Sequence, residues 1–365
     1  MKVPILDLKA QYAAIKDEIN PAINQICENQ LFCLGPALTQ FEEKIAQYCQ
    51  SKYTIGLSSG SDALLVSLMA LEIKPSDEVI TSPFTFFATA GSIARLSAKP
   101  VFVDIDPDSY NIDPALIEEK VTEKTRAIIP VHLFGQIAQM KPIMEIAERH
   151  DLAVIEDAAQ SIGATQNGKK CGNFGLCGCL SFYPTKNLGG FGDGGLVTTN
   201  DENFAEKIKT LRDHGQKPRY FYKIIGGNFR LDCIQAAVLS VKLKYLNQWN
   251  DKRRQNAVLY DNFFAGSEVK PPQIDSNNIS IYHQYTVAVP ERDRLKEYLA
   301  EKEIGSAIFY PHPLHLQECF RQLGHNKGDF PVAERLCEDV LSLPIYPELK
   351  KEQIEYVANA ILEFY

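Results

Sequence analysis

The sequence predicts an α/β fold built on a largely parallel sheet that helices cover on both faces. Over the first 245 residues, short runs, most of them rich in Val, Ile or Phe, alternate with helix-like stretches, and Gly, Pro or Asp commonly stand at the ends of the runs. This alternation is typical of βαβ units, whose strands lie parallel. The strands are expected at residues 53–57, 78–82, 100–104, 127–131, 152–156, 178–182 and 195–199.

The helix-like stretches between the first five strands include residues 62–71, 85–96 and 140–150. The interval from 171 to 199 is different, because it leaves too little room for the dozen or so residues that a helical crossover needs. One strand in this interval is therefore expected to run antiparallel to its neighbour.

The chain is expected to divide into a large domain, residues 1–245, and a smaller α+β domain, residues 246–365. A long helical pattern runs from about Leu231 past the sole tryptophan, Trp249, towards Phe264, and the boundary falls within it. The smaller domain should contain one strand and two helices, at residues 284–289, 291–302 and 331–341. Whether the N-terminal segment packs on the smaller domain is left open.

Composition and charge exclude several classes of protein. The net charge of −8 argues against a general binder of nucleic acid or anionic membranes, which would need a basic surface. The first residues lack the apolar core of a signal peptide, and no run of about 18 apolar residues could span a membrane. Nine scattered cysteines suit a reducing cytosol. We therefore expect a cytoplasmic protein that contacts neither nucleic acid nor membrane.

The nearest cysteines in the sequence, Cys171, Cys177 and Cys179, lack a fourth ligand at the regular spacing of a zinc site. No metal is expected. Two glycine patterns also resemble nucleotide motifs. Gly190, Gly192 and Gly195 fit GxGxxG but precede a strand rather than a helix, and the GxxxxGK of residues 163–169 lacks the Ser or Thr that a P-loop requires.

Polar residues follow two of the predicted parallel strands, at the edge where ligands bind in open α/β sheets. Small residues at 58–62 run from the first strand into a helix, whose free N–H groups could bind an anion; an ordinary capped turn would look the same. Asp157 directly follows the fifth strand, where it could face a ligand or cap a helix.

Lys186 stands on a loop after the sixth strand, between Pro184 and the pair Gly189–Gly190. A desolvated lysine has a lowered pKa and forms Schiff bases with carbonyls, although most lysines simply lie on the surface. The anion-binding turn, Asp157 and Lys186 together match what pyridoxal 5′-phosphate (PLP) requires: a cradle for its phosphate, a carboxylate for its ring nitrogen and an amine for its aldehyde.

At this point the sequence resembles a known family, the sugar-nucleotide aminotransferases of the DegT/DnrJ/StrS group, across nearly its whole length. The motifs that carry the resemblance lie at residues 6–8, 34–36, 60–64, 83–89, 156–160, 181–186, 193–195, 228–232, 235–237 and 310–314. The resemblance implies PLP-dependent transferase fold type I, with a mostly parallel seven-stranded sheet flanked by helices.

The resemblance also implies roles for individual residues. Lys186 matches the lysine that forms the Schiff base and shuttles protons, and Asp157 the partner of the ring nitrogen. Gln160 resembles the residue near the ring oxygen of the cofactor, and Phe86 the ring that stacks on the pyridine face. Related sugar dehydratases carry histidine in place of this lysine, so Lys186 favours transamination.

The phosphate binders of the family match Gly60, Ser61 and Ser181 within one chain. Asn228 matches a phosphate ligand that the neighbouring subunit supplies, so a homodimer with shared active sites is implied.

The substrate-side candidates are His214, Arg230 and Tyr310. Arginine suits a diphosphate or carboxylate because its planar fork binds two oxygens, while an interdomain salt bridge is an equal alternative for Arg230. His312 and His315 flank prolines and could be structural.

In this family glutamate usually donates the amino group and leaves as 2-oxoglutarate, and a nucleotide-linked keto-sugar accepts it. The stretch 189–195 resembles the C3-aminating branch, and residues 213–216, 219–220 and 277–280 resemble enzymes acting on UDP-linked 2-acetamido-3-keto sugars or 3-ketoglucuronates. A dTDP-3-keto-6-deoxyhexose is a further possible substrate for amination at C3. The reaction would serve the biosynthesis of amino sugars for bacterial surface polysaccharides. The alternatives are C4 amination of a 4-keto-6-deoxyhexose and a non-catalytic regulatory PLP-binding protein.

Overall fold

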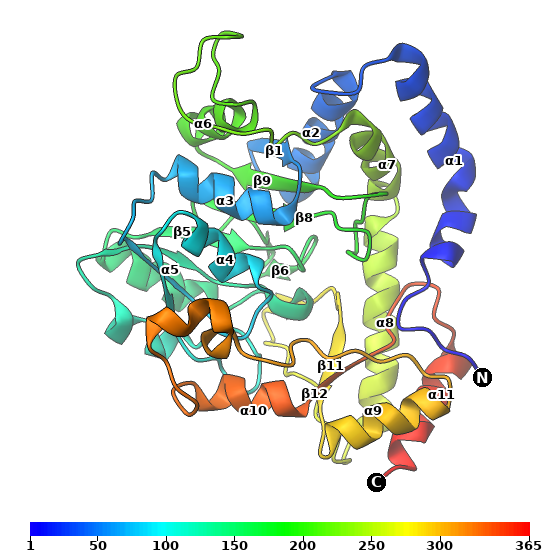
Figure 1. The fold of residues 1–365 in the computed structure, drawn as a ribbon. Helices are drawn as coiled ribbons and strands as arrows, with labels where there is room; N and C mark the ends of the chain where they lie inside the picture. The colour runs from blue at the N-terminus through cyan, green and yellow to red at the C-terminus, as the bar shows by residue number, and fades with distance from the viewer.

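All seven predicted strands form one central sheet in the computed structural model, which describes residues 1–365 (Figure 1). Their bounds are β1 (Tyr53–Leu57), β2 (Glu78–Thr81), β3 (Lys99–Phe102), β4 (Thr125–Ile129), β5 (Ala153–Asp157), β8 (Cys177–Ser181) and β9 (Gly195–Thr199). The strand order is β1-β9-β8-β5-β4-β2-β3. Only β9 runs antiparallel to its neighbours, which confirms the expectation of one antiparallel strand between 171 and 199.

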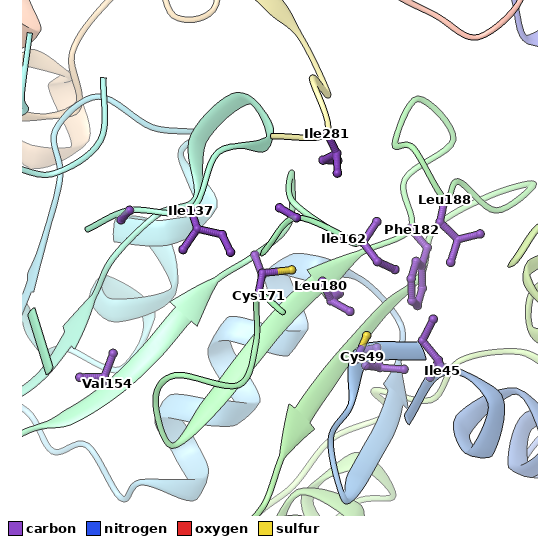
Figure 2. Close-up of a cluster of buried hydrophobic side chains, with 14 of the residues drawn as sticks. Ile45, Cys49, Ile137, Val154, Ile162, Cys171, Leu180, Phe182, Leu188 and Ile281 are labelled. Atoms are coloured by element: carbon purple, nitrogen blue, oxygen red, sulfur yellow. The ribbon is translucent and has the colours of Figure 1, made fainter. Parts of the chain in front are cut away.

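Helices cover both faces of this sheet, as predicted. They are α1 (Leu8–Asn29), α2 (Pro36–Cys49), α3 (Gly60–Ala70), α4 (Ala88–Arg95), α5 (Met140–Arg149), α6 (Glu202–Arg212) and α7 (Cys233–Leu243). Successive strand residues point to opposite faces, so Leu196 of β9 joins the core beneath α2, α5 and α7, whereas Val197 joins the core beneath α3 and α6. Figure 2 shows part of the first core, where Leu180 of β8 lies with Ile45 and Cys49 of α2.

The C-terminal part of the chain has its own buried cluster, to which Val3 also belongs. The helices and strands of this part of the chain are α8 (Leu246–Phe264), β11 (Tyr285–Ala288), α9 (Arg292–Glu301), α10 (Pro331–Asp339), β12 (Val340–Leu343) and α11 (Lys351–Leu362). Of these, α10 packs in a separate cluster with Phe102 and Phe320. Strand β11 pairs antiparallel with β12. Val3 also bridges to Ile304, next to α9. The domain boundary at residue 246 stays a prediction.

The long helix expected from Leu231 to Phe264 is wrong, because the chain forms two helices, α7 and α8, that are separated at Lys244 and Tyr245. The backbone N–H of Tyr245 bonds the carbonyl of Lys242, three residues back (3.0 Å), so the last turn of α7 tightens and its regular ladder ends. The Tyr245 ring stacks on Trp249, the residue that packs the first half of α8 against α1 and α7.

The helix expected at 331–341 is also too long, because Val340 and Leu341 belong to β12. These residues are fully buried and pair with Ala288 and Val287 of β11. The apolar pattern at 340–341 therefore belongs to a strand that follows α10 directly.

The remaining elements are short. They are the strands β6 (Thr165–Gln166), β7 (Lys169–Lys170) and β10 (Asn278–Ile279), and the 3-10 helices Pro114–Leu116, Glu118–Lys120, Leu133–Gly135, Leu314–Leu316 and Glu318–Leu323. The GxxxxGK stretch forms the β6–β7 hairpin, with Asn167 and Gly168 at positive φ in its turn, and GxGxxG runs into β9. No helix is long and apolar enough to cross a membrane.

Candidate active site

A cavity of about 710 Å³ lies where β5 and β8 end and α3 begins, on the edge of the sheet that the sequence indicated. Eight of the predicted site residues line it: Gly60, Ser61, Phe86, Asp157, Gln160, Ser181, Lys186 and Tyr310. Residues separated by up to 250 positions along the chain thus share one wall.

The first part of this wall is the start of α3. The side chain of Ser59 caps the helix by accepting a hydrogen bond from a backbone N–H of its first turn (3.0 Å). The remaining N–H groups at a helix start have no partner within the helix and carry partial positive charge. A Cβ on Gly60 would lie 2.6 Å from the Cβ of Ser181, so glycine lets the end of β8 pack directly against the helix. Together with the hydroxyls of Ser61 and Ser181, this corner can bind an anion.

Asp157, at the end of β5, is the second part of the wall. Its Oδ2 accepts a hydrogen bond from the Thr89 hydroxyl (2.7 Å) and its Oδ1 accepts one from the backbone N–H of Ala159 (3.2 Å). Burial raises the pKa of the Asp157 carboxyl, and the two hydrogen bonds oppose that rise. These bonds fix the direction of the carboxylate. A cationic partner in the cavity would stabilise its ionised form.

A buried hydrogen bond between His132 and Glu156 holds the end of β5 behind Asp157. Nδ1 of His132 accepts a hydrogen bond from a backbone N–H (3.2 Å), so Nε2 carries the proton and donates to Glu156 Oε2 (2.9 Å). Three further backbone N–H groups, from residues 172, 174 and 175, donate to Glu156 at 2.6–2.9 Å. The backbone N–H of His132 also donates to the carbonyl of Asp157. The fully buried Glu156 is thus well solvated by protein donors, which makes this strand end rigid.

Lys186 reaches the cavity from the turn that follows β8, where its backbone N–H bonds the carbonyl of Tyr183 (2.8 Å). Burial lowers the pKa of Lys186 to about 8, and Asp157 is the charged group that opposes this shift. Near neutral pH a useful fraction of this amine is therefore unprotonated, as nucleophilic attack on a carbonyl requires.

Gln160 and Tyr310 form a further part of the cavity wall. Gln160 Nε2 donates to the Tyr310 hydroxyl (3.0 Å), while Gln160 Oε1 accepts from the backbone N–H of Phe134 (2.8 Å). Burial raises the pKa of Tyr310, so its hydroxyl stays protonated. The Phe86 ring, 57% exposed, lies 6.3 Å from the Tyr310 ring. These two rings offer a flat ligand an aromatic surface.

Sequence reasoning missed His283, which also lines the cavity. The amide of Asn187 donates to the Ile281 carbonyl (3.1 Å), so its oxygen must accept a hydrogen bond from Nδ1 of His283 (3.2 Å). Burial and the nearby charges of Lys186 and Arg253 hold the pKa of His283 well below its usual range. His283 is therefore neutral, with Nε2 as its acceptor nitrogen. The sequence around His283 contains no motif that indicates a role for it, because a single histidine before a strand is not distinctive.

His214, Asn228 and Arg230 do not line the cavity of their own chain. They lie in the connection from α6 to α7, whose tip extends away from the sheet in Figure 1 and whose return passes β1, where Arg230 bridges to Leu57. Arg230 Nη1 forms an ion pair with Asp213 Oδ1 (2.7 Å), and Asn228 bridges to Asp213 through the backbone. Their roles in substrate and phosphate binding stay predictions, and a second subunit would have to bring them to a cavity.

His315 is buried and lies 3.0 Å from Glu334, away from the cavity, which favours the structural alternative for it. The cysteines Cys171, Cys177 and Cys179 are buried free thiols, and no group of three or more His, Cys, Asp or Glu side chains could hold a metal ion.

Comparison with known proteins gives consistent results. Residues 13–362 match the sequence profile of the DegT/DnrJ/EryC1/StrS aminotransferase family. The chain is 50% identical to a protein of Geobacillus stearothermophilus named pleiotropic regulatory protein, over 100% of this chain and 99% of that one. It is 43% identical to the UDP-N-acetyl-3-dehydro-alpha-D-glucosamine 3-aminotransferase of Acidithiobacillus ferrooxidans, over 98% and 97% of the two chains. The crystal structure of S. venezuelae DesV in complex with a ketimine intermediate superimposes with a TM-score of 0.97 at 39% identity, covering 100% of this chain and 98% of that one.

Proposed function

Because the chain belongs to the DegT/DnrJ/EryC1/StrS aminotransferase family, we propose that it moves an amino group from L-glutamate to C3 of a nucleotide-linked 3-keto-hexose. Members of this family are PLP-dependent aminotransferases of sugar nucleotides, and this chain is one of them. The observation that carries the proposal is the meeting of Lys186, Asp157 and the start of α3 in one cavity.

The chemistry of the donor set fits PLP. The start of α3, with Ser61 and Ser181, offers N–H and hydroxyl donors for a phosphate. Asp157 can hold a proton on the ring nitrogen, because a cation beside this buried carboxyl offsets the burial that raises its pKa. When bound, PLP supplies an electron sink that allows an amino group to leave one substrate and join another.

The chain's own residues would then orient the cofactor and move protons. Lys186 Nζ, with its pKa lowered to about 8, would move protons between the cofactor and the reacting carbon of the donor, and then between the cofactor and the sugar carbon. Phe86 would stack on the ring, and Gln160 would approach its ring oxygen while its amide stays fixed between Phe134 and Tyr310. Two substrates would use this one cavity in turn, so we expect ping-pong kinetics.

Amination at C3 of a UDP-linked 2-acetamido-3-keto sugar is the substrate assignment that the comparisons support best, because the Acidithiobacillus relative is named for that reaction. The name of the Geobacillus relative describes a regulator, and this name is the observation that favours the non-catalytic alternative. Against that alternative, the cavity keeps both the lysine of lowered pKa and the oriented carboxylate, neither of which simple cofactor retention needs.

The reverse reaction tests this assignment. With 2-oxoglutarate as acceptor, the protein should consume a UDP-2-acetamido-3-amino sugar and form glutamate, while the 4-amino regioisomer should be consumed at least about 100-fold more slowly. Both rates can be followed by mass spectrometry of the sugar nucleotide together with an enzymatic glutamate assay. Faster consumption of the 4-amino sugar would make C4 amination the function, and consumption of neither would favour the regulatory alternative.

The proposed homodimer predicts complementation between two inactive variants. If Asn228 binds phosphate in the neighbouring subunit's site, mixing Lys186→Ala with Asn228→Ala should create mixed dimers in which one site has both native residues. Activity should return to about a quarter of wild type after complete exchange, because half of the dimers are mixed and each has one intact site. Native mass spectrometry would measure the exchange. Mixed dimers without recovered activity would contradict a shared site.

A further inference from the structure

The glycine-rich stretch 189–195, whose GxGxxG pattern leads into a strand rather than a helix, is held by two side chains of α7. Gln235 Oε1 accepts a hydrogen bond from the backbone N–H of Phe191 (2.7 Å). A Cβ on Gly190 would lie 2.7 Å from Gln235 Oε1, and one on Gly192 would lie 3.1 Å from its Nε2. Glycine at both positions therefore lets the Gln235 amide approach the backbone of this stretch.

Lys242, the second of these side chains, is a buried cation. It is only 3% exposed, its Nζ donates to the carbonyl of Gly189 (2.7 Å), and it lies 4.9 Å from the centre of the Phe191 ring. Burial alone lowers the pKa of Lys242, to about 8, and no neighbouring carboxylate opposes that shift. Burying a charge without an anionic partner is costly. The contacts that offset this cost all belong to the glycine-rich stretch.

This stretch is joined directly to the turn that carries Lys186. Gly189 is so close to the turn that a Cβ on it would lie 2.3 Å from the carbonyl oxygen of Pro184. The backbone N–H of Gly190 bonds the carbonyl of Phe182 (2.7 Å), just before the turn. At its other end the stretch reaches Gly194, which lines the cavity. A shift of Gly189 would therefore displace the turn and change the direction of Lys186.

We propose that Lys242 is a positioning residue for the reaction: with Gln235, it fixes Gly189–Gly192 on α7 and thereby sets the direction of Lys186 Nζ. The inference rests on the proposed role of Lys186. It assigns the GxGxxG pattern to the close approach of two α7 side chains rather than to a bound ligand.

Hydrogen exchange and kinetics of the PLP-loaded protein test the inference. In Lys242→Met, which keeps the length of the side chain but removes its charge and donor, amides of residues 189–195 should exchange about tenfold faster, with unchanged rates elsewhere. The kcat should fall about tenfold while the KM of either substrate changes less than twofold, because the walls of the cavity remain. Lys242→Arg should restore most of both properties. Lys244→Met is the matched control, since Lys244 pairs with exposed Glu18 on the outside, and it should behave as wild type.

Wild-type exchange and kcat in Lys242→Met would overturn the inference, as would faster exchange spread over the whole chain. If Lys242→Met does not fold, Gln235→Ala serves instead, and it should loosen the same amides; unchanged exchange there would also overturn the inference. The exchange readout separates this proposal from the proposed function. A Lys186→Ala protein that kept full turnover would contradict the catalytic role of Lys186, whatever the exchange of residues 189–195.

Discussion

Replacement of Lys186 by alanine should lower kcat by at least about 10⁴-fold, because one side chain supplies both the nucleophilic amine and the proton transfer. The start of α3, Asp157 and the aromatic rings remain, so the protein should still bind PLP with its phosphate. Stopped assays of glutamate formation from a 3-amino sugar nucleotide would measure the loss. A small primary amine in the buffer should restore part of the rate, since it can enter a cavity of about 710 Å³.

Lys170→Ala is the matched control for this variant. Lys170 is also partly buried and has a lowered pKa, but it lies over the Tyr48 ring (3.7 Å), outside the cavity. The control should keep wild-type turnover. Retention of more than about a tenth of the activity in Lys186→Ala would reject the role assigned to Lys186.

Replacement of Asp157 by asparagine should lower kcat by about 150- to 5,000-fold. The change is nearly isosteric: the amide oxygen can still accept from the N–H of Ala159, and the amide NH2 can donate to the Thr89 hydroxyl, whose own proton can go to the carbonyl of Phe86. The negative charge beside the ring nitrogen is lost. A buried charge without its partner costs about 3–5 kcal/mol, and each 1.36 kcal/mol corresponds to a factor of ten in rate. Steady-state kinetics at saturating concentrations of both substrates would measure the effect.

The loss of kcat in Asp157→Asn should not be accompanied by a loss of stability. Burial raises the pKa of Asp157 in the folded protein, so folding disfavours its ionised form, and a neutral amide removes that cost. Thermal unfolding of the cofactor-free protein should therefore occur at the wild-type temperature or higher. Thr89→Val, which removes one hydrogen bond but keeps the charge, should reduce kcat by about tenfold or less. An Asp157→Asn variant as active as Thr89→Val would show that the charge is not required.

The sequence predicted the central sheet well because each strand is a short apolar run between turn residues, and all seven lie within two residues of the expected bounds. It also placed Asp157 and Lys186 at strand ends, where parallel topology brings distant residues together. Helix ends were harder to predict. The break at Lys244 and Tyr245 lies just before Trp249, whose ring packs against distant α1 as well as α7. The helix at 331–341 ends where β12 pairs with β11.

The supporting residues could not be read from the sequence for a different reason. His283, Thr89 and Lys242 act on residues far away in the chain, and each is an ordinary residue within an ordinary helix or near a strand. Their importance comes from their burial and from the atoms that they contact. The local hydrophobic pattern of the sequence predicts neither property. Asn228 was suggested by resemblance alone, and it lies outside the cavity of its own chain.

The antiparallel course of β9 also has an evolutionary consequence. Because Ser181 pairs with Gly195, and the N–H of Phe182 bonds the carbonyl of Gly194, the loop that carries Lys186 is tied together at its base. An insertion or deletion within this loop would change the position of Lys186, so its length should be invariant among active relatives. The rim of the cavity at Phe86, which is 57% exposed, carries no such tie to the lysine. New sugar specificities can therefore evolve at the rim while the chemistry stays constant.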